Sequence, residues 1–210
     1  MEAVLRLYSL PAEAGVARLC MDELPCQLLS DVMTPLPASP GSVQKVDYEY
    51  KREGTCTVLL IYDIDQGRRY TQVRAQRTKK DYAEFIDQVI AEHYADAKAV
   101  KLVQDNLNTH KKGSFYEHLP KERAYELSEL IEFVFTPKHG SWLNMAEIEC
   151  SALSRQCMDR RIGSIEALRT EVGLWTERRN EDGIGINWRF TVGNARERLS
   201  AKYRNVNPEN

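Results

Sequence analysis

The sequence lacks the long apolar runs of a membrane protein and the leader of a secreted one. Hydrophobic residues make up 42% of its 210 positions and charged residues 29%, the proportions of an ordinary globular protein. No run of about 20 apolar residues could span a bilayer. The N-terminal segment carries Glu2 and Glu13 and has neither the basic start nor the apolar stretch of a signal peptide. We therefore expect a single cytoplasmic domain.

Clustered metal-binding residues are also missing. The cysteines are odd in number, contain no CxxC pair and fall in apolar or helical surroundings, and the histidines are scattered. A structural zinc site requires ligands that are closer together in the sequence. We predict buried free thiols for the five cysteines, which are Cys20, Cys26, Cys56, Cys150 and Cys157.

An excess of positive charge is absent as well. The formal net charge is −2, so overall electrostatics give no argument for a nucleic-acid partner. Basic residues nevertheless occur in pairs, and paired basic residues usually lie on solvated surfaces. They would favour DNA only if the fold brought several of them to one side. The pairs are Arg68-Arg69, Lys79-Lys80, Lys111-Lys112, Arg160-Arg161 and Arg178-Arg179.

Prolines and glycines divide the first third of the chain. Three prolines and a glycine predict that residues 33–55 are mostly a loop. Residues 17–23 predict a short strand that ends in acids. Residues 56–64 and 69–76, with Gly67 between them, predict a β-hairpin.

The remainder alternates between helices and strands. Apolar residues at helical spacing predict a helix over 79–95, with an acid, Asp81, in its first turn where the helix dipole favours one. Short apolar runs predict two strands, over 99–106 and 131–137, and three further helices are expected over 116–130, 143–158 and 164–180, the last with Ser164 as N-cap. This order indicates a mixed α/β sheet flanked by helices.

Three acids lie where such a sheet would place a site. Asp22 ends the first predicted strand, Asp105 ends a middle strand, and Glu147 lies on the helix after the last strand. Converging carboxylates stay ionised only when cations neutralise them, and oxygen ligands suit Mg²⁺ or Mn²⁺. Two such ions catalyse phosphodiester chemistry. With 31 acidic residues in the chain, spacing alone does not select these three.

Sequence motifs select them. LVQDNLNTH (102–110) and TPKHGSWLNMAEIE (136–149) resemble bacterial insertion-sequence transposases of the Tc/mariner superfamily, a DDE family with an RNase H-like catalytic domain. In that family the second acid lies in a DN…TH strand end and the third follows W-L-N-x-x-E, which gives Asp105 and Glu147. MDE (21–23) matches the first acid, Asp22. The resemblance continues to residue 196 and covers almost the whole chain.

The resemblance implies an RNase H-like mixed sheet flanked by helices, as one catalytic domain over residues 1–210 that lacks the family's N-terminal helix-turn-helix region. It implies cleavage of transposon-end phosphodiesters and transfer of the 3′-hydroxyl end to target DNA. Asp22 and Asp105 would share two Mg²⁺ or Mn²⁺ ions, and Glu147 would complete the shell of the second ion. The expected partners are DNA, both transposon ends and target, and a second copy of the chain in a homodimer.

Neighbouring residues leave alternatives open. Glu23 and Glu149 are the nearest rival carboxylates, although Glu149 lies about 200° around the helix axis from Glu147, so both cannot face one site. Asn106 and His110 would either brace the turn at Asp105 or contact phosphate.

The loop and tryptophans near the last motif have alternatives of their own. Lys138 and His139 would reach the scissile phosphate or simply lie in a solvated loop. Trp142 and Trp175 are expected to pack in the protein rather than to stack on bases.

Two rival functions fit the same residues. A truncated, non-catalytic transposase derivative would pair with or inhibit the full-length enzyme. A ribonuclease of the RNase H type would share the metal chemistry, but the family motifs do not support it.

Overall fold

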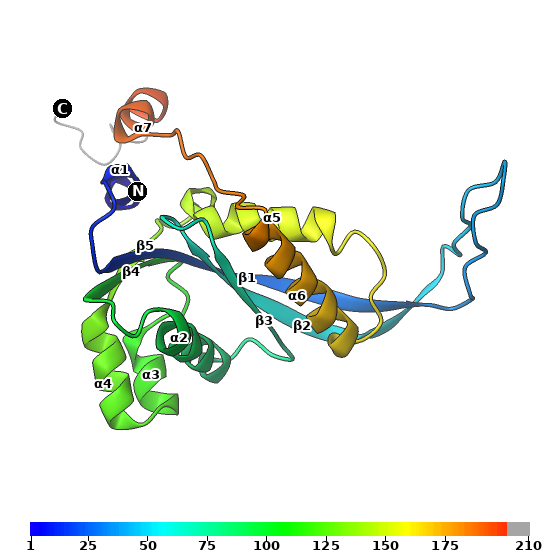
Figure 1. Ribbon diagram of the computed structural model, residues 1–210, viewed down its shortest axis with the longest axis horizontal. Helices are drawn as coiled ribbons and strands as arrows, with labels where there is room; N and C mark the ends of the chain where they lie inside the picture. The colour runs from blue at the N-terminus through cyan, green and yellow to red at the C-terminus, as the bar shows by residue number, and fades with distance from the viewer. Residues whose placement is uncertain (201–210) are drawn as a thin grey trace.

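A five-stranded sheet forms the centre of the computed structural model, which describes residues 1–200 (Figure 1). The strands lie side by side in the order β3-β2-β1-β4-β5, with β1, β2 and β3 antiparallel and β4 and β5 parallel to β1. The strands are β1 (Val16–Asp31), β2 (Tyr50–Asp63), β3 (Arg69–Arg74), β4 (Ala99–Gln104) and β5 (Ile131–Phe135). The expected mixed sheet flanked by helices is confirmed.

Helices cover both faces of this sheet. The helices are α1 (Glu2–Ser9), α2 (Lys79–His93), α3 (Lys112–His118), α4 (Lys121–Leu130), the 3-10 turn η1 (Ser141–Leu143), α5 (Met145–Gln156), α6 (Ile165–Glu181) and α7 (Val192–Arg198). Side chains of α2, α3 and α4 form one apolar core with one face of the sheet. Side chains of α1, α5, α6 and α7 form two further apolar cores with residues of the opposite face. None of the helices within residues 1–200 is long and apolar enough to cross a membrane.

The predicted hairpin and the predicted long helix are confirmed. β2 pairs with β3 across the turn at Gly67, whose φ of 65° suits a residue without a side chain. α2 begins at the N-cap Thr78, and the side chain of Asp81 accepts hydrogen bonds from the backbone and hydroxyl of Thr78. The acid in the first turn therefore belongs to a capping box.

The first strand is longer than expected, so the prediction that Asp22 ends a short strand is wrong. β1 continues to Asp31 because β2 pairs with it along this whole length. Beyond Cys20, β1 has no pairing with β4, and an open edge of this kind tolerates Pro25. β2 accordingly begins at Tyr50, inside the segment that was expected to be mostly loop.

Other boundaries also differ. The single helix expected over 116–130 is two helices, α3 and α4, which are separated at Pro120 because proline cannot continue the first one. The short helices α1 and α7 were not predicted. The five cysteines are buried free thiols, as predicted. The expectation of one domain over 1–210 reaches into residues 201–210, which lie outside the described range.

An arm, residues 32–49, extends from the ends of β1 and β2 well beyond the sheet (Figure 1). Its base is held by Arg161, which donates hydrogen bonds to the carboxylate of Asp31 (2.6 Å) and to the backbone oxygens of Asp47 (2.7 Å) and Glu49 (2.9 Å). One member of a basic pair therefore supports the fold instead of a DNA-binding face.

Candidate active site

Strands β1 and β4 bring two of the candidate acids side by side. Their parallel pairing ends with Cys20 opposite Val103. Two residues further along each strand, the same register leads to Asp22 and Asp105. Asp105 directly follows the end of β4, as predicted. Asp22 lies within β1, just beyond the point where pairing with β4 stops. The end of the β4 pairing, and not the end of β1, therefore exposes Asp22 at the edge of the sheet.

The start of α5 places Glu147 next to this pair. Asn144 is the N-cap, and its side-chain oxygen accepts a hydrogen bond from the backbone of Ala146 (3.1 Å). Its amide group donates to the backbone oxygen of Met21 (2.8 Å), and both groups are buried. One side chain thus ends the loop, starts the helix and ties it to β1 beside Asp22. The sequence contained this signal, because an asparagine before a helical segment predicts an N-cap.

Electrostatics show that the three carboxylates share one neighbourhood. Burial raises the pKa of Asp22 to about 6, and the charges of Asp105, Glu147 and Glu23 act in the same direction against a hydrogen bond from the backbone of Glu23. The ionised form of Asp22 is therefore disfavoured until a cation approaches.

Each of the three carboxylates has one oxygen held by the protein. The hydrogen bonds are Glu23 backbone N–H to Asp22 Oδ1 (2.8 Å), His110 Nδ1 to Asp105 Oδ1 (2.5 Å) and Ser141 Oγ to Glu147 Oε1 (3.3 Å). The second oxygen of each group accepts no hydrogen bond from any described residue. Three oxygens are thus available to another ligand.

The chemical type of these oxygens suits a divalent metal ion. Within residues 1–200 no three acid, histidine or cysteine side chains are close enough to hold a metal ion as they stand. Carboxylate oxygens are nevertheless the ligands that Mg²⁺ and Mn²⁺ prefer, and a cation would offset both the burial and the neighbouring negative charges that raise the pKa of Asp22. The donor set therefore suits a hard cation that draws the three groups together.

His110 braces Asp105 and does not face solvent. Its ring is 1% exposed and lies between the carboxylates of Asp105 and Glu23. Burial acts to lower its pKa, but the hydrogen bonds with these two carboxylates raise the pKa to about 9. Of the two roles expected for His110, the structure supports the bracing role.

The other candidate DNA ligands lie on the surface. Asn106 follows Asp105 and is exposed, as are Lys138 and His139 in the loop before η1. His139 has a φ of 61°, a conformation that few residues other than glycine adopt.

The two tryptophans pack as expected, although one only partly. Trp142 is 45% exposed and meets Phe190 edge to face at 5.3 Å. Trp175 donates its indole N–H to Gln156 (2.9 Å).

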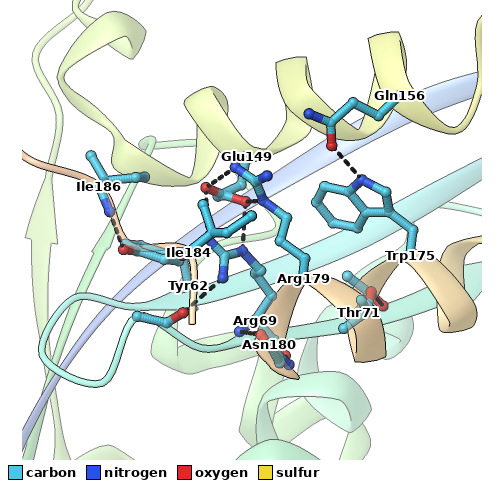
Figure 2. Close-up of polar contacts among 12 residues, drawn as sticks. Tyr62, Arg69, Thr71, Glu149, Gln156, Trp175, Arg179, Asn180, Ile184 and Ile186 are labelled. Carbon is cyan, nitrogen blue, oxygen red and sulfur yellow. Dashed lines mark hydrogen bonds and ion pairs between the residues drawn. The ribbon is translucent and has the colours of Figure 1, made fainter. Parts of the chain in front are cut away.

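Glu149 points away from the site and is fully buried (Figure 2). Its carboxylate accepts hydrogen bonds from Arg69 of β3 (2.6 and 2.9 Å) and from Arg179 of α6 (2.7 and 3.2 Å). Burial would raise its pKa, but these two arginines lower it below the ordinary value. The expectation that Glu149 faces elsewhere than Glu147 is confirmed.

The arginines of this network were not recognised from the sequence. Arg69 is 0% exposed, and its guanidinium also donates to the backbone oxygens of Gly67 (2.7 Å) and Ile184, while the amide side chain of Asn180 pairs with its backbone N–H and oxygen (Figure 2). The sequence predicted Arg69 and Arg179 only as members of basic pairs. Arg69 is the first residue of the strand, and nothing in the strand pattern indicates its partner.

Comparisons with known proteins identify the family and the fold of the chain. Residues 17–169 match the model of the family described as DDE superfamily endonuclease. No curated protein sequence matches the chain. Membership of this family implies the use of a divalent metal.

Solved structures of the Mos1 mariner transposase share the fold. The paired end complex with Mn has 13% identity and a TM-score of 0.53 over 79% of this chain and 51% of that one. The strand transfer complex has 13% identity and a TM-score of 0.54 over 79% and 50%. The isolated catalytic domain has 10% identity and a TM-score of 0.51 over 79% and 74%. This chain thus spans about half the length of the Mos1 chains in the complexes. It belongs to the DDE superfamily endonucleases, and it has the RNase H-like fold of a mariner-type transposase catalytic domain.

Proposed function

We propose that the chain cleaves DNA at transposon ends and transfers the freed 3′-hydroxyl end to target DNA, with Asp22, Asp105 and Glu147 as its catalytic carboxylates. The observation that carries this proposal is that β1, β4 and the start of α5 bring these acids near one another, where each keeps an oxygen without a hydrogen bond to any described residue. The family membership and the mariner-type fold support it.

Two Mg²⁺ or Mn²⁺ ions are the cofactors that these residues suit. Asp22 and Asp105 would share the ions, and Glu147 would complete the set of ligands. A bound pair of such ions lowers the pKa of an attacking hydroxyl or water and neutralises charge on the leaving oxygen. The chain itself fixes the carboxylates, since Asn144 holds the start of α5 and His110 holds Asp105.

Phosphate contacts would come from the exposed side chains near these carboxylates. Lys138 and His139 precede the helix of Glu147, and Asn106 follows Asp105. All three are exposed, so a DNA backbone could reach them. The similar Mos1 structures are a paired end complex and a strand transfer complex, which supports transposon ends and target DNA as the partners of this chain.

A homodimer is the third part of the proposal. The arm carries large apolar side chains that are more than half exposed, which is typical of a surface that meets a partner. They are Val32, Met33, Leu36, Val43, Val46 and Tyr48. Sedimentation of the wild type should show a dimer, and Val43→Ser with Tyr48→Ser should shift it to monomer. A wild type that stays monomeric with and without end DNA would contradict the pairing.

Plasmid nicking tests the cleavage directly. Wild-type chain with Mn²⁺ should nick supercoiled DNA, and Asp22→Asn and Asp105→Asn should each lose about a hundredfold or more of this rate because charge stabilisation in the transition state is removed. Glu129→Gln, at an exposed acid of α4, is the matched control and should keep the rate. Equal nicking by all four proteins would place the active site elsewhere. Preferential cutting of an RNA–DNA hybrid would favour the ribonuclease.

A further inference from the structure

Glu23 is a fourth carboxylate beside the candidate site, and none of the roles described so far uses it. It follows Asp22 on β1, so its side chain points to the opposite face of the sheet. That side chain is 3% exposed. Its Oε1 lies 3.1 Å from His110 Nε2, within hydrogen-bonding distance. Its Oε2 lies 3.2 Å from Nε of Arg77, but this second oxygen accepts no hydrogen bond from any described residue.

His110 connects this buried carboxylate to Asp105. Both ring nitrogens are occupied, Nδ1 by Asp105 Oδ1 at 2.5 Å and Nε2 by Glu23. Because an ionised carboxylate only accepts hydrogen bonds, each ring nitrogen acts as the donor. The ring is thus held at two points and cannot rotate without breaking one of them.

A second set of buried contacts fixes the same ring. The ring of Tyr82 lies against it with centroids 4.8 Å apart and planes inclined by 32°. Gln104, at the end of β4, donates to the backbone oxygen of His110 (3.2 Å) and accepts from the Tyr82 hydroxyl (2.8 Å). Tyr82, Gln104 and His110 are each at most 1% exposed. Among the described residues, Glu23 is the hydrogen-bonding partner of Nε2.

We propose that Glu23 is a positioning residue for Asp105. Through His110 it holds Oδ1 of Asp105 in place and leaves Oδ2 as the oxygen available to a divalent cation. The inference rests on the proposed function, because it assigns Glu23 a role in the metal site and not only in the fold. This role also explains why Glu23, although adjacent to Asp22, is not one of the proposed metal ligands. Its oxygens face His110 and Arg77 instead.

Direct measurement of Mn²⁺ binding by calorimetry tests this role without relying on cleavage. Glu23→Ala should weaken Mn²⁺ binding about 10- to 100-fold, the usual cost of losing a residue that orients a metal ligand. Glu23→Gln should stay within about threefold of wild type, because its amide oxygen can still accept the hydrogen bond from His110. Gln27→Ala, at an exposed residue of the same strand, is the control and should bind as wild type does.

The contrary results separate the two proposals. A folded Glu23→Ala protein that binds Mn²⁺ like wild type, or a Gln variant as weak as the Ala variant, would overturn the positioning role. If wild type and Asp105→Asn bind Mn²⁺ equally, the proposed metal site itself is wrong. Nitrogen NMR of the wild type gives a readout that needs no variant, even if Glu23→Ala does not fold. Slowly exchanging N–H protons on both ring nitrogens of His110 are expected, and rapid exchange of either would contradict the proposed hydrogen bonds to Asp105 and Glu23.

Discussion

Two glutamates on one helix have opposite surroundings. Glu147, near the start of α5, shares its neighbourhood with the carboxylates of Asp22 and Asp105, and one of its oxygens is free within the described chain. Glu149, two residues later, is fully buried and accepts four hydrogen bonds from Arg69 and Arg179. A rotation of about 200° around the helix separates the two side chains. One region therefore concentrates negative charge, and the other neutralises it inside the protein.

The difference shows how the chemistry of a carboxylate depends on its partners. Two arginines make the Glu149 group a structural ion pair that joins α5, β3 and α6 (Figure 2). Near Glu147, His110 pairs with Asp105, whereas Asp22 has no ion pair with any described residue and burial raises its pKa. We expect stability to depend on the region around Glu149 and, under the proposed function, cleavage to depend on the region around Glu147, so variants in the two regions should fail in different ways.

The largest expected effect on stability comes from removing the buried cation of the structural region. Arg69→Met should lower the free energy of unfolding by about 3–5 kcal/mol, because Glu149 loses a buried partner. Chemical denaturation measures this loss. Arg68→Met, at the exposed neighbouring arginine, should change it by less than about 0.5 kcal/mol.

The sign of the pH dependence sharpens this prediction. The pKa of Glu149 is lowered in the folded chain, so its pairing stabilises the protein above the unfolded value of 4.5 and is lost as the pH falls through the folded value. The gap between Arg69→Met and wild type should therefore narrow in acid. A gap of the same size at every pH would mean that lost packing, and not the ion pair, accounts for it.

A smaller and opposite effect on stability is expected at the candidate site. Asp22→Asn should raise the melting temperature of the metal-free protein by a few degrees, since about 1 kcal/mol corresponds to 2–4 °C at this size. The folded pKa of about 6 exceeds the unfolded value of 3.8, so ionisation of Asp22 destabilises the fold increasingly from the lower value to the higher one and fully above it. The stabilisation should therefore grow over this range and then level off. A melting temperature that falls at neutral pH would contradict the shared neighbourhood.

The smallest expected effect concerns the DNA contact near Glu147. The chain should bind DNA weakly and with little sequence preference, and Lys138→Gln should reduce the slope of log affinity against log salt by about 1. Lys121→Gln, at an exposed lysine of α4, should leave the slope unchanged. Equal slopes for both variants would place the DNA away from Lys138.

Local patterns predicted most of the fold. The hairpin at Gly67, the capping box of α2 and the break between β4 and the acid that follows it are all determined by a few adjacent residues. Pairing between distant strands was not visible in this way. The length of β1 depends on β2, which lies after the arm in the sequence, so the strand was expected to end at its acids.

The candidate site was predicted only in part, because its supporting contacts also join segments that are distant in the sequence. The family motifs indicated Asp22, Asp105 and Glu147, and helical geometry excluded Glu149. The residues that hold this site were harder to assign. Nothing near Glu23 in the sequence indicates a contact with His110, and nothing near Arg69 indicates Glu149, because each of these pairs forms only when the sheet and its helices are assembled.

The most direct test of the division between the two glutamates is a crossed measurement of Glu147→Gln and Glu149→Gln. Thermal unfolding of each variant would be followed without metal, and strand cleavage with Mn²⁺ would be measured per folded molecule. Glu147→Gln should unfold like wild type and lose cleavage by about a hundredfold or more. Glu149→Gln should unfold at a clearly lower temperature and, where it remains folded, cleave within about tenfold of wild type. A stable, inactive Glu149→Gln beside an active Glu147→Gln would contradict the account.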